Sequence, residues 1–424
     1  MLPKGKPENR VIVPNFDRYL SQNGIRKLEQ PDPLTGRPLG QVLKVVHVLD
    51  ADSFEARLGI GSDRNDKGGK KPGIYALNFD FDKNPDESEP TADIKSRLVA
   101  LHEQREIFRE NPFAAVVIVH EELGPIGYGQ GSSFGSRRSG VVGWGQGSVL
   151  GSTGVVYGQY GAIADSAQME ILYPGVFKSG QVPNYRGCGV AGLLFAAGFT
   201  LVEEIAGRPA VGAVYESEFV GQVQAKDGRL DMDAMRYTRT RLHMHELLGG
   251  CGIVAVMADG THIPVWKQPA LSSVMRHGQE FAVGVPYMFN LAFKPADPAA
   301  PRGVVREWAK PEVRAMLNLL VDNFSIEGFD RYLITERKAR AMFGIRTDGP
   351  ISNVELARRS IMEVVDQAVQ ILLVPLSQTK NYAEYAMGHR PLEHQLRSDY
   401  EGHPFAGMPL QQISHEINRI VGRV

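Results

Sequence analysis

Cysteine is almost absent from this sequence. Its 424 residues include only two, Cys188 and Cys251, which excludes a framework of several disulfide bonds and favours a reducing compartment. No window approaches the roughly 18 consecutive apolar residues of a transmembrane helix, and the N-terminal Met-Leu-Pro-Lys-Gly-Lys segment lacks the apolar stretch of a signal peptide. We therefore expect a cytoplasmic protein with no membrane partner.

An excess of either charge is also missing. Lys and Arg total 47 and Asp and Glu total 48, which gives a formal net charge of -1. Binding to nucleic-acid phosphates needs a basic run or stripe, and none stands out, so we expect no nucleic-acid partner. Hydrophobic residues (43%) and charged residues (22%) are present at the levels of an ordinary globular protein, and the length suggests two or three domains.

The first part of the chain is predicted to be an extension. Residues 1–40 are rich in Pro, Lys, Asn and Gly, which indicates an irregular arm, whereas 41–60 turn apolar and β-branched, which indicates a strand. Polar, glycine-containing stretches at 61–71 and 82–91 are typical of exposed loops. We therefore predict a partly irregular N-terminal extension over residues 1–92.

Helices and strands are then predicted up to residue 257. Helical spacing appears at 91–111 and ends at Pro112, and the apolar run 114–119 predicts a buried strand. Residues 126–164 alternate glycine with aromatic and β-branched residues, which predicts antiparallel hairpins. The cluster Gly-Tyr-Gly-Gln-Gly at 127–131 has no helix pattern after it, so we favour a hairpin over a nucleotide loop. Further on, we predict a strand over 167–177, a helix over 188–206, a strand over 210–215, a helix over 232–248 and a strand over 251–257.

These elements are predicted to form one domain over 93–293. The proline-rich stretch 294–302 marks a linker, and 303–424 is predicted to be mainly helical, with Asn353 capping a helix over Val354–Val374. The polar and aromatic tail at 389–400 either covers an acceptor site, forms a homodimer face or is ordinary surface, and we favour ordinary surface.

One segment carries specific chemistry. Residues 183–191 read Pro-Asn-Tyr-Arg-Gly-Cys-Gly-Val-Ala, with an apolar run upstream and an apolar helix directly after the glycines. Glycines let a phosphate approach the backbone, and the unpaired N–H groups and dipole of a helix N-terminus favour an anion. Arg186 would order this loop or add charge. We therefore expect a diphosphate site formed by Arg186, Gly187, Cys188, Gly189, Val190 and Ala191.

This segment resembles a known family. Arg-Gly-Cys-Gly-Val-Ala matches the Arg/Gln-x-x-Gly-x-Gly/Ala signature of the GCN5-related N-acetyltransferase (GNAT) superfamily, and the preceding Pro-Asn-Tyr is similar to the Pro-Glu-Tyr often found there. The order of elements over about 95–260 resembles that fold as well. The resemblance implies an α/β fold with a mainly antiparallel central sheet flanked by helices. It also implies transfer of an acetyl or other acyl group from acyl-CoA to a primary amine of a small molecule or peptide. An acyl carrier protein is an alternative donor.

Two other interpretations of the loop stay open. One is a glycine turn that binds nothing. The other is a Rossmann dinucleotide site, because Gly187, Gly189 and Gly192 have its spacing and Glu216 follows the next strand. Against this, the polar stretch 178–186 separates the first glycine from its strand, and hairpins precede it rather than a βα unit.

The resemblance also suggests catalytic groups. Glu170 lies within the apolar run Met-Glu-Ile-Leu-Tyr, where a carboxylate has a raised pKa that suits a general base; the alternative is a solvated strand face. His245 stands where family members have a tyrosine acid, and an imidazolium could protonate the leaving thiolate. Tyr215 is the alternative acid, and His245 is alternatively a helix-surface residue.

The remaining assignments concern the thiol, the pantetheine arm and metals. Cys188 at a helix start is expected to have a lowered pKa, but we favour direct transfer over an acyl-cysteine. Pro174-Gly175 resembles the bulge that opens a strand for pantetheine, so the backbones of Val176 and Phe177 are assigned to that arm. His243 and His245 do not share a helix face, so no metal is expected. The alternative function is a non-catalytic acyl-CoA sensor or interaction module.

Overall fold

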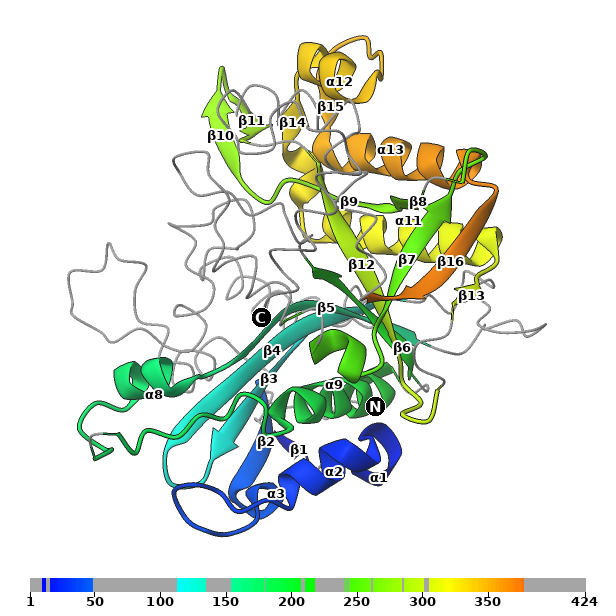
Figure 1. The fold of residues 1–424 in the computed structure, drawn as a ribbon. Coiled ribbons are helices and arrows are strands. Elements are labelled where there is room, and N and C mark those ends of the chain that lie inside the picture. The colour runs from blue at the N-terminus through cyan, green and yellow to red at the C-terminus, as the bar shows by residue number, and fades with distance from the viewer. Residues whose placement is uncertain are drawn as a thin grey trace, which may run out of the picture. The chain divides into compact units, whose positions relative to one another are not determined.

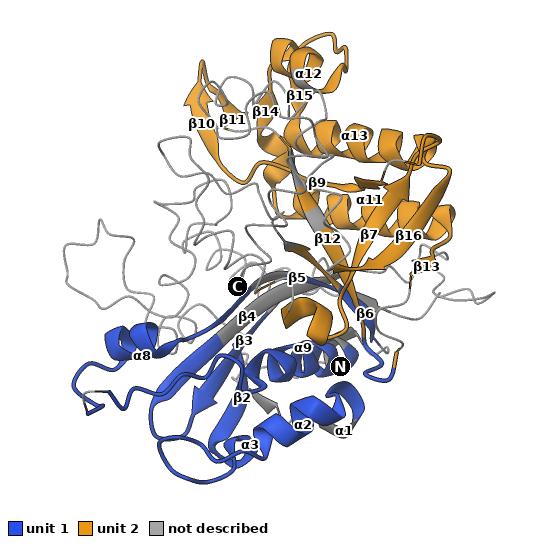
Figure 2. Ribbon diagram, viewed as in Figure 1, with its two compact units in different colours: residues 1–213, 296–299 blue, residues 214–295, 300–424 orange. Residues whose placement is uncertain are grey.

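The computed structural model describes two compact units. The described residues are 10–12, 16–48, 113–134, 154–178, 180–206, 210–217, 241, 244–260, 262–283, 286–300 and 305–376. Unit 1 comprises 1–213 and 296–299, and unit 2 comprises 214–295 and 300–424 (Figure 2). The boundary at 213/214 falls inside the range 93–293 that the sequence assigns to one domain.

Unit 1 contains an antiparallel meander. Its strands are β1 (Arg10–Ile12), β2 (Leu43–Val48), β3 (Phe113–His120), β4 (Gly124–Phe134), β5 (Gly154–Ile163) and the first half of β6 (Ala210–Ser217), in that spatial order. Each neighbouring pair from β1 to β5 is antiparallel. The antiparallel pairing of β4 with β5 confirms the predicted hairpin character of 126–164 for the residues described there, with 135–153 lying outside them, and places the glycine cluster 127–131 within a strand.

Five helices belong to the described part of this unit. They are α1 (Phe16–Tyr19), α2 (Gln22–Leu28), α3 (Leu39–Val42), α8 (Ser166–Leu172) and α9 (Val190–Ala206). The apolar sequence of α9 packs on β3, β4 and β5 (Figure 1), and its residues Leu193, Ala196 and Ala197 are buried in the core of unit 1. The rings of Tyr19 in α1 and Phe199 in α9 lie 5.3 Å apart, so the N-terminal segment is part of that core.

Two predictions in this unit are wrong. Residues 1–40 are not simply an irregular arm, because Ser21 caps α2 by accepting a hydrogen bond from the Gly24 N–H. The strand predicted over 167–177 is instead helix α8, followed by a turn. Asp165 and Gln168 form a capping box at its start, which satisfies backbone N–H groups of the first turn and favours a helix over the extended form.

Unit 2 contains two sheets. The larger has the spatial order β12 (Tyr287–Pro295), β7 (Cys251–Val256), β16 (Gln370–Pro375) and β13 (Arg306–Glu307), with β8 (His262–Pro264) beside β7 and β9 (Trp266–Gln268) beside β12. The smaller contains β10 (Ser273–Arg276), β11 (Gln279–Ala282), β14 (Leu333–Ile334) and β15 (Ile351–Ser352). The pairing of β11 with β14 is parallel, and the other pairings recorded for these two sheets are antiparallel.

The helices of unit 2 are α11 (Lys310–Ile326), α12 (Glu336–Phe343) and α13 (Asn353–Gln367), with a short 3-10 turn at Phe329–Arg331. Helix α11 buries a stripe at helical spacing, which comprises Val313, Met316, Leu317, Leu320, Val321 and Phe324. Ser352, not Asn353, caps α13, and the helix ends at Gln367 rather than Val374 because the following residues pair with β7 as β16. The region after 303 therefore contains strands as well as the predicted helices.

Both units combine helices with mainly antiparallel sheets, as the sequence predicts at this level. The helix predicted over 91–111, the start of the helix over 232–248 and the tail at 389–400 lie outside the described residues. Among the described helices, none has the length and apolar character needed to cross a bilayer.

Candidate functional site

The glycine loop lies directly before α9 in unit 1. Gly187 has φ 82° and Gly189 has φ 89°, and both values lie in the left-handed region that glycine adopts without strain. The Leu193 N–H donates to the Gly189 carbonyl at 3.1 Å, which opens the helix. The backbone N–H groups of the first turn of α9 therefore have no carbonyl partner within the helix.

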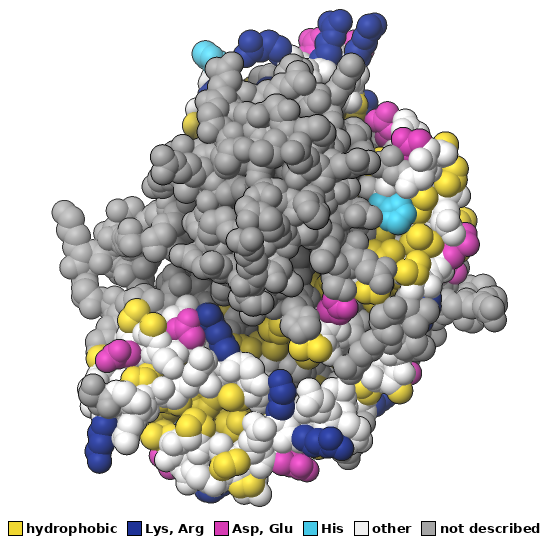
Figure 3. All heavy atoms as spheres, in the orientation of Figure 1, with side chains coloured by type: hydrophobic (Ala, Val, Ile, Leu, Met, Phe, Trp, Pro, Cys, Tyr) yellow, Lys and Arg dark blue, Asp and Glu magenta, His cyan; other side chains and the backbone are white. Residues whose placement is uncertain are grey.

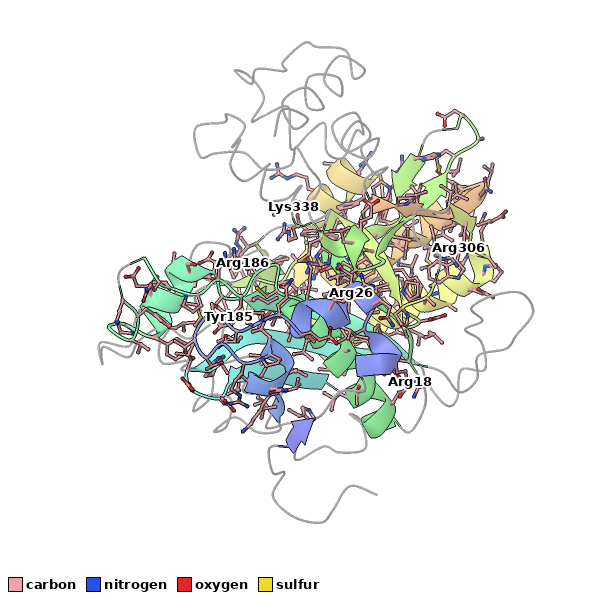
Figure 4. All side chains as sticks on the ribbon, turned by 60° about the horizontal axis from the view of Figure 1, so that its bottom comes forward. Arg18, Arg26, Tyr185, Arg186, Arg306 and Lys338 are labelled. Atoms are coloured by element: carbon pink, nitrogen blue, oxygen red, sulfur yellow. The ribbon has the colours of Figure 1, made fainter. Side chains whose placement is uncertain are left out.

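Arg186 holds the start of this loop at the end of β5. Its Nε donates to the Ile163 carbonyl at 2.8 Å and its Nη2 to Gln168 Oε1 at 3.0 Å. Its Nη1 lies 2.9 Å from Asp165 Oδ2. These contacts bring the start of the loop back to the end of β5, although α8 lies between them in the sequence. Figure 4 labels Arg186 beside Tyr185. The guanidinium is engaged within the protein and is not a free cation.

The two glycines of the loop face different surroundings. A Cβ on Gly189 would lie 3.1 Å from Lys27 Cβ and 3.4 Å from the Gly24 carbonyl, so α2 packs tightly against this side. A Cβ on Gly187 would meet no heavy atom of the described residues within 4 Å. The open side of the loop is therefore at Gly187.

Lys27, in the last turn of α2, is a cation that the sequence analysis did not identify. Its side chain is half-buried beside Gly189, and within the described part of the chain it makes no hydrogen bond or ion pair. Its positive charge partly offsets the rise that burial causes in the pKa of the Cys188 thiol, so the ammonium is close enough to the loop to act on it. No local signal in the sequence connects Lys27 with a loop about 160 residues further on.

Tyr185, directly before Arg186, anchors the loop to the N-terminal segment. Its hydroxyl is buried and donates to Asp32 Oδ1 at 3.0 Å. Burial by itself raises the pKa of Asp32, but hydrogen bonds from Thr35 and Tyr185, with the close approach of His120, outweigh burial and leave the pKa below its ordinary value. Burial, and then the charge of Asp32, raise the pKa of Tyr185. Tyr185 therefore stays a protonated donor to a carboxylate.

His120 completes this network. Its Nδ1 accepts hydrogen bonds from the N–H groups of Glu122 and Leu123 at 3.2 and 3.3 Å. Nε2 therefore carries the hydrogen that faces Asp32 Oδ2, 3.3 Å away. Asp32, His120 and Tyr185 are 1%, 0% and 0% exposed, so the network holds the loop in place rather than meeting a substrate.

The Cys188 thiol differs from its expected state. Its Sγ lies 3.4 Å from the Asn184 carbonyl, in half-buried surroundings. Burial raises its pKa more than Lys27 lowers it, and Asp32 adds to the rise. The lowered pKa expected at a helix start is therefore wrong, and the thiol form disfavours an acyl-cysteine.

The residues assigned to a splayed strand lie elsewhere. Glu170 is exposed on α8, so it does not occupy the apolar strand that the sequence suggested. Val176 is 56% exposed in the turn after α8, and Phe177 packs partly on the core of unit 1. No strand forms at 173–177, and Arg186 at the start of the loop contacts Ile163, the last residue of β5, instead.

The two candidate acids lie together in unit 2. The ring centroids of Tyr215 and His245 are 4.5 Å apart, and Gly250 packs against both residues. Burial raises the pKa of Tyr215, so its phenol stays protonated. Burial, followed by the charge of Arg241, lowers the pKa of His245 to about 3, so its imidazole is neutral at pH 7. The imidazolium expected as proton donor is not the favoured form.

A separate surface feature lies on α12. A cavity of about 560 Å³ is lined by Glu336, Arg337, Arg340 and Ala341. Lys and Arg side chains gather at this end of unit 2 (Figure 3). None of the sequence-predicted site residues is among these lining residues. In the described part of the chain, no group of three or more His, Cys, Asp and Glu side chains is arranged to hold a metal.

Comparison of the chain with protein-family models, with curated proteins and with solved structures yields no match.

Proposed function

We propose that unit 1 binds the diphosphate of an acyl-CoA at the glycine loop and that the protein transfers the acyl group to a primary amine, as a GNAT-type N-acyltransferase. The observation that carries this proposal is the pair of left-handed glycines, Gly187 and Gly189, directly before α9, in a loop that Arg186 ties to the end of β5. A turn of this kind leaves backbone N–H groups available to an anion.

Three further features support a donor site here. The loop and α9 lie between β5 and β6, which are neighbours in the sheet, as the family resemblance implies, although α8 is inserted between β5 and the loop. Lys27 supplies a positive charge that no other described residue neutralises. The open side at Gly187 gives the phosphates a route to the backbone.

The proposed chemistry is direct attack of the amine on the thioester carbonyl. Glu170, on α8, is the proposed base, and Arg186 ties this helix to the loop through Gln168. The family resemblance offers Tyr215 or His245 as the acid, and neither is preferred: burial makes the Tyr215 phenol a weak acid, and the His245 imidazole is neutral at pH 7. Glu170→Gln should abolish thiol release while donor affinity is retained.

A matched pair of variants tests the donor site. Asn and Asp both tolerate the left-handed conformation of Gly187, but only Asp adds a negative charge. We expect Gly187→Asp to bind CoA at least tenfold more weakly than Gly187→Asn by titration calorimetry, whereas pantetheine, which lacks the diphosphate, shows no such difference. Equal CoA affinities for both variants, or no heat with wild type, would refute the proposal.

The alternative function is a non-catalytic acyl-CoA sensor. The exposed position of Glu170 favours this alternative, because an exposed carboxylate lacks the apolar surroundings expected of a tuned base. CoA binding without thiol release on a broad panel of primary amines would support the sensor over the enzyme.

A further inference from the structure

A buried lysine in unit 2 lies opposite a buried serine. Lys267 of β9 is 8% exposed and Ser360 of α13 is 4% exposed. Nζ of Lys267 donates to Oγ of Ser360 and lies 5.1 Å from the centroid of the Phe343 ring. Within the described residues no carboxylate forms an ion pair with this ammonium, which is unusual for a buried charge.

The surrounding backbone fixes this pair. Asn353, at the start of α13, accepts from the Ala270 N–H at 2.7 Å and donates to the Ala270 carbonyl at 3.1 Å. Ala270 is three residues after Lys267, and Ser360 is two helical turns after Asn353 on the same face. The two hydrogen bonds therefore set the register that brings Nζ to Oγ.

Burial changes the protonation of the amine. Removal from water lowers the pKa of Lys267 to about 8, and the charge of Glu363 opposes this only in part. About a tenth of the amine is therefore neutral at pH 7, and about half at pH 8. A neutral amine has a lone pair that can take the proton of the adjacent hydroxyl, which is how a serine is activated by a base.

We propose that Ser360 and Lys267 form a nucleophile–base pair that accepts small activated acyl groups, as esters or thioesters. Ser360 Oγ forms a bond to the carbonyl carbon while its proton passes to Nζ of Lys267. Collapse of the tetrahedral adduct breaks the bond to the leaving alkoxide or thiolate, which takes up the proton from Nζ. The product is an acyl-serine. Because both side chains are buried, the donor chosen for the test carries a small acyl group. This pair is independent of the function proposed for unit 1.

The test uses p-nitrophenyl acetate with the full-length protein, followed by peptide mapping by mass spectrometry. We expect one acetyl group on Ser360, acquired at a rate that rises with pH and levels off above about 8. Ser360→Ala should lose this acetyl group. Ser325→Ala, which removes a partly exposed serine of α11, should retain it.

Lys267→Met separates a chemical role from a structural one. It removes the base but keeps an apolar side chain of similar length, so we expect a folded protein whose Ser360 is acetylated at least tenfold more slowly. An unmodified Ser360 in wild type at pH 9, an acetyl group on Lys267 instead, or equal rates in wild type and Lys267→Met would each overturn the proposal. If Lys267→Met does not fold, the wild-type pH profile decides.

Discussion

The guanidinium of Arg186 contacts the carbonyl oxygen of Ile163, a residue 23 positions earlier in the chain, with 2.8 Å between Nε and the oxygen. This contact brings the glycine loop back to the end of β5 after the excursion through α8. Arg186 therefore acts on the loop by positioning it, and its charge is paired with Asp165.

If Arg186 positions the loop, its ion-pair partner Asp165 should be as important for stability and CoA binding as Arg186 itself. We expect Arg186→Gln and Asp165→Asn each to lower the free energy of unfolding by about 1–3 kcal/mol, because both break the same partly buried hydrogen-bonded pair. We also expect both to weaken CoA binding by a similar factor. Urea unfolding and calorimetry measure the two effects. If Arg186 instead touched phosphate directly, Asp165→Asn would leave CoA affinity unchanged.

Lys27 is predicted to supply charge at the loop. Lys27→Gln should weaken CoA binding about tenfold and make the affinity less dependent on salt, because one charge-assisted contact to phosphate is lost. Its neighbour Arg26 is exposed in the same turn of α2, and Arg26→Gln serves as the matched control with a smaller effect. Equal losses in the two variants would indicate general electrostatic attraction rather than a specific contact.

Gly250 is predicted to tolerate no side chain. A Cβ there would collide with the Tyr215 hydroxyl and lie 2.9 Å from the His245 carbonyl. We expect Gly250→Ala to lower the free energy of unfolding by about 1–3 kcal/mol through overpacking. Gly198→Ala in α9 is the control. A Cβ there meets no described atom within 4 Å, and alanine should raise helix stability by up to about 1 kcal/mol. A lower melting temperature for Gly250→Ala and a higher one for Gly198→Ala would agree with this prediction. An unchanged melting temperature for Gly250→Ala would contradict it.

His245 is predicted to make the protein sensitive to acid. Its pKa is about 3 in the folded state and 6.5 ordinarily, so the unfolded chain binds the extra proton between these values. Stability from this residue is complete above pH 6.5 and falls as the pH drops toward 3, by about 1.4 kcal/mol per unit. From pH 6.5 to 5, wild type should therefore lose about 2 kcal/mol more than His245→Phe in urea unfolding. The same loss in both proteins would rule out a buried neutral imidazole.

The elements that the sequence predicted correctly have local signals. The apolar run at β3, the glycine alternation of β4 and β5 and the apolar sequence of α9 each determine one element without help from distant residues. Helix α8 was missed because Glu-Ile-Leu-Tyr favours an extended chain, whereas the capping box at Asp165 and Gln168 favours a helix. The helix predicted to Val374 was too long for a similar reason, because a short apolar run such as 371–374 fits either a helix or a strand.

The site was predictable only where it is continuous in sequence. The glycines of the loop, Gly187 and Gly189, could be found because they lie two residues apart in one short motif. Lys27, Asp32 and His120 could not be found, because each reaches the loop through tertiary contacts. Tyr185, for example, hydrogen bonds to a residue 153 positions away. A buried partner of this kind leaves no pattern in a single sequence.

The hydrogen bond between Tyr185 and Asp32 bears on how this protein can be subdivided for expression. A recombinant fragment starting at residue 93 would retain the whole glycine loop but lack α2, Lys27 and Asp32. The tyrosine hydroxyl would lose its acceptor, and the packed side of Gly189 would face solvent. Fragments intended for ligand-binding work should therefore begin before Phe16, so that the N-terminal helices accompany the loop they support.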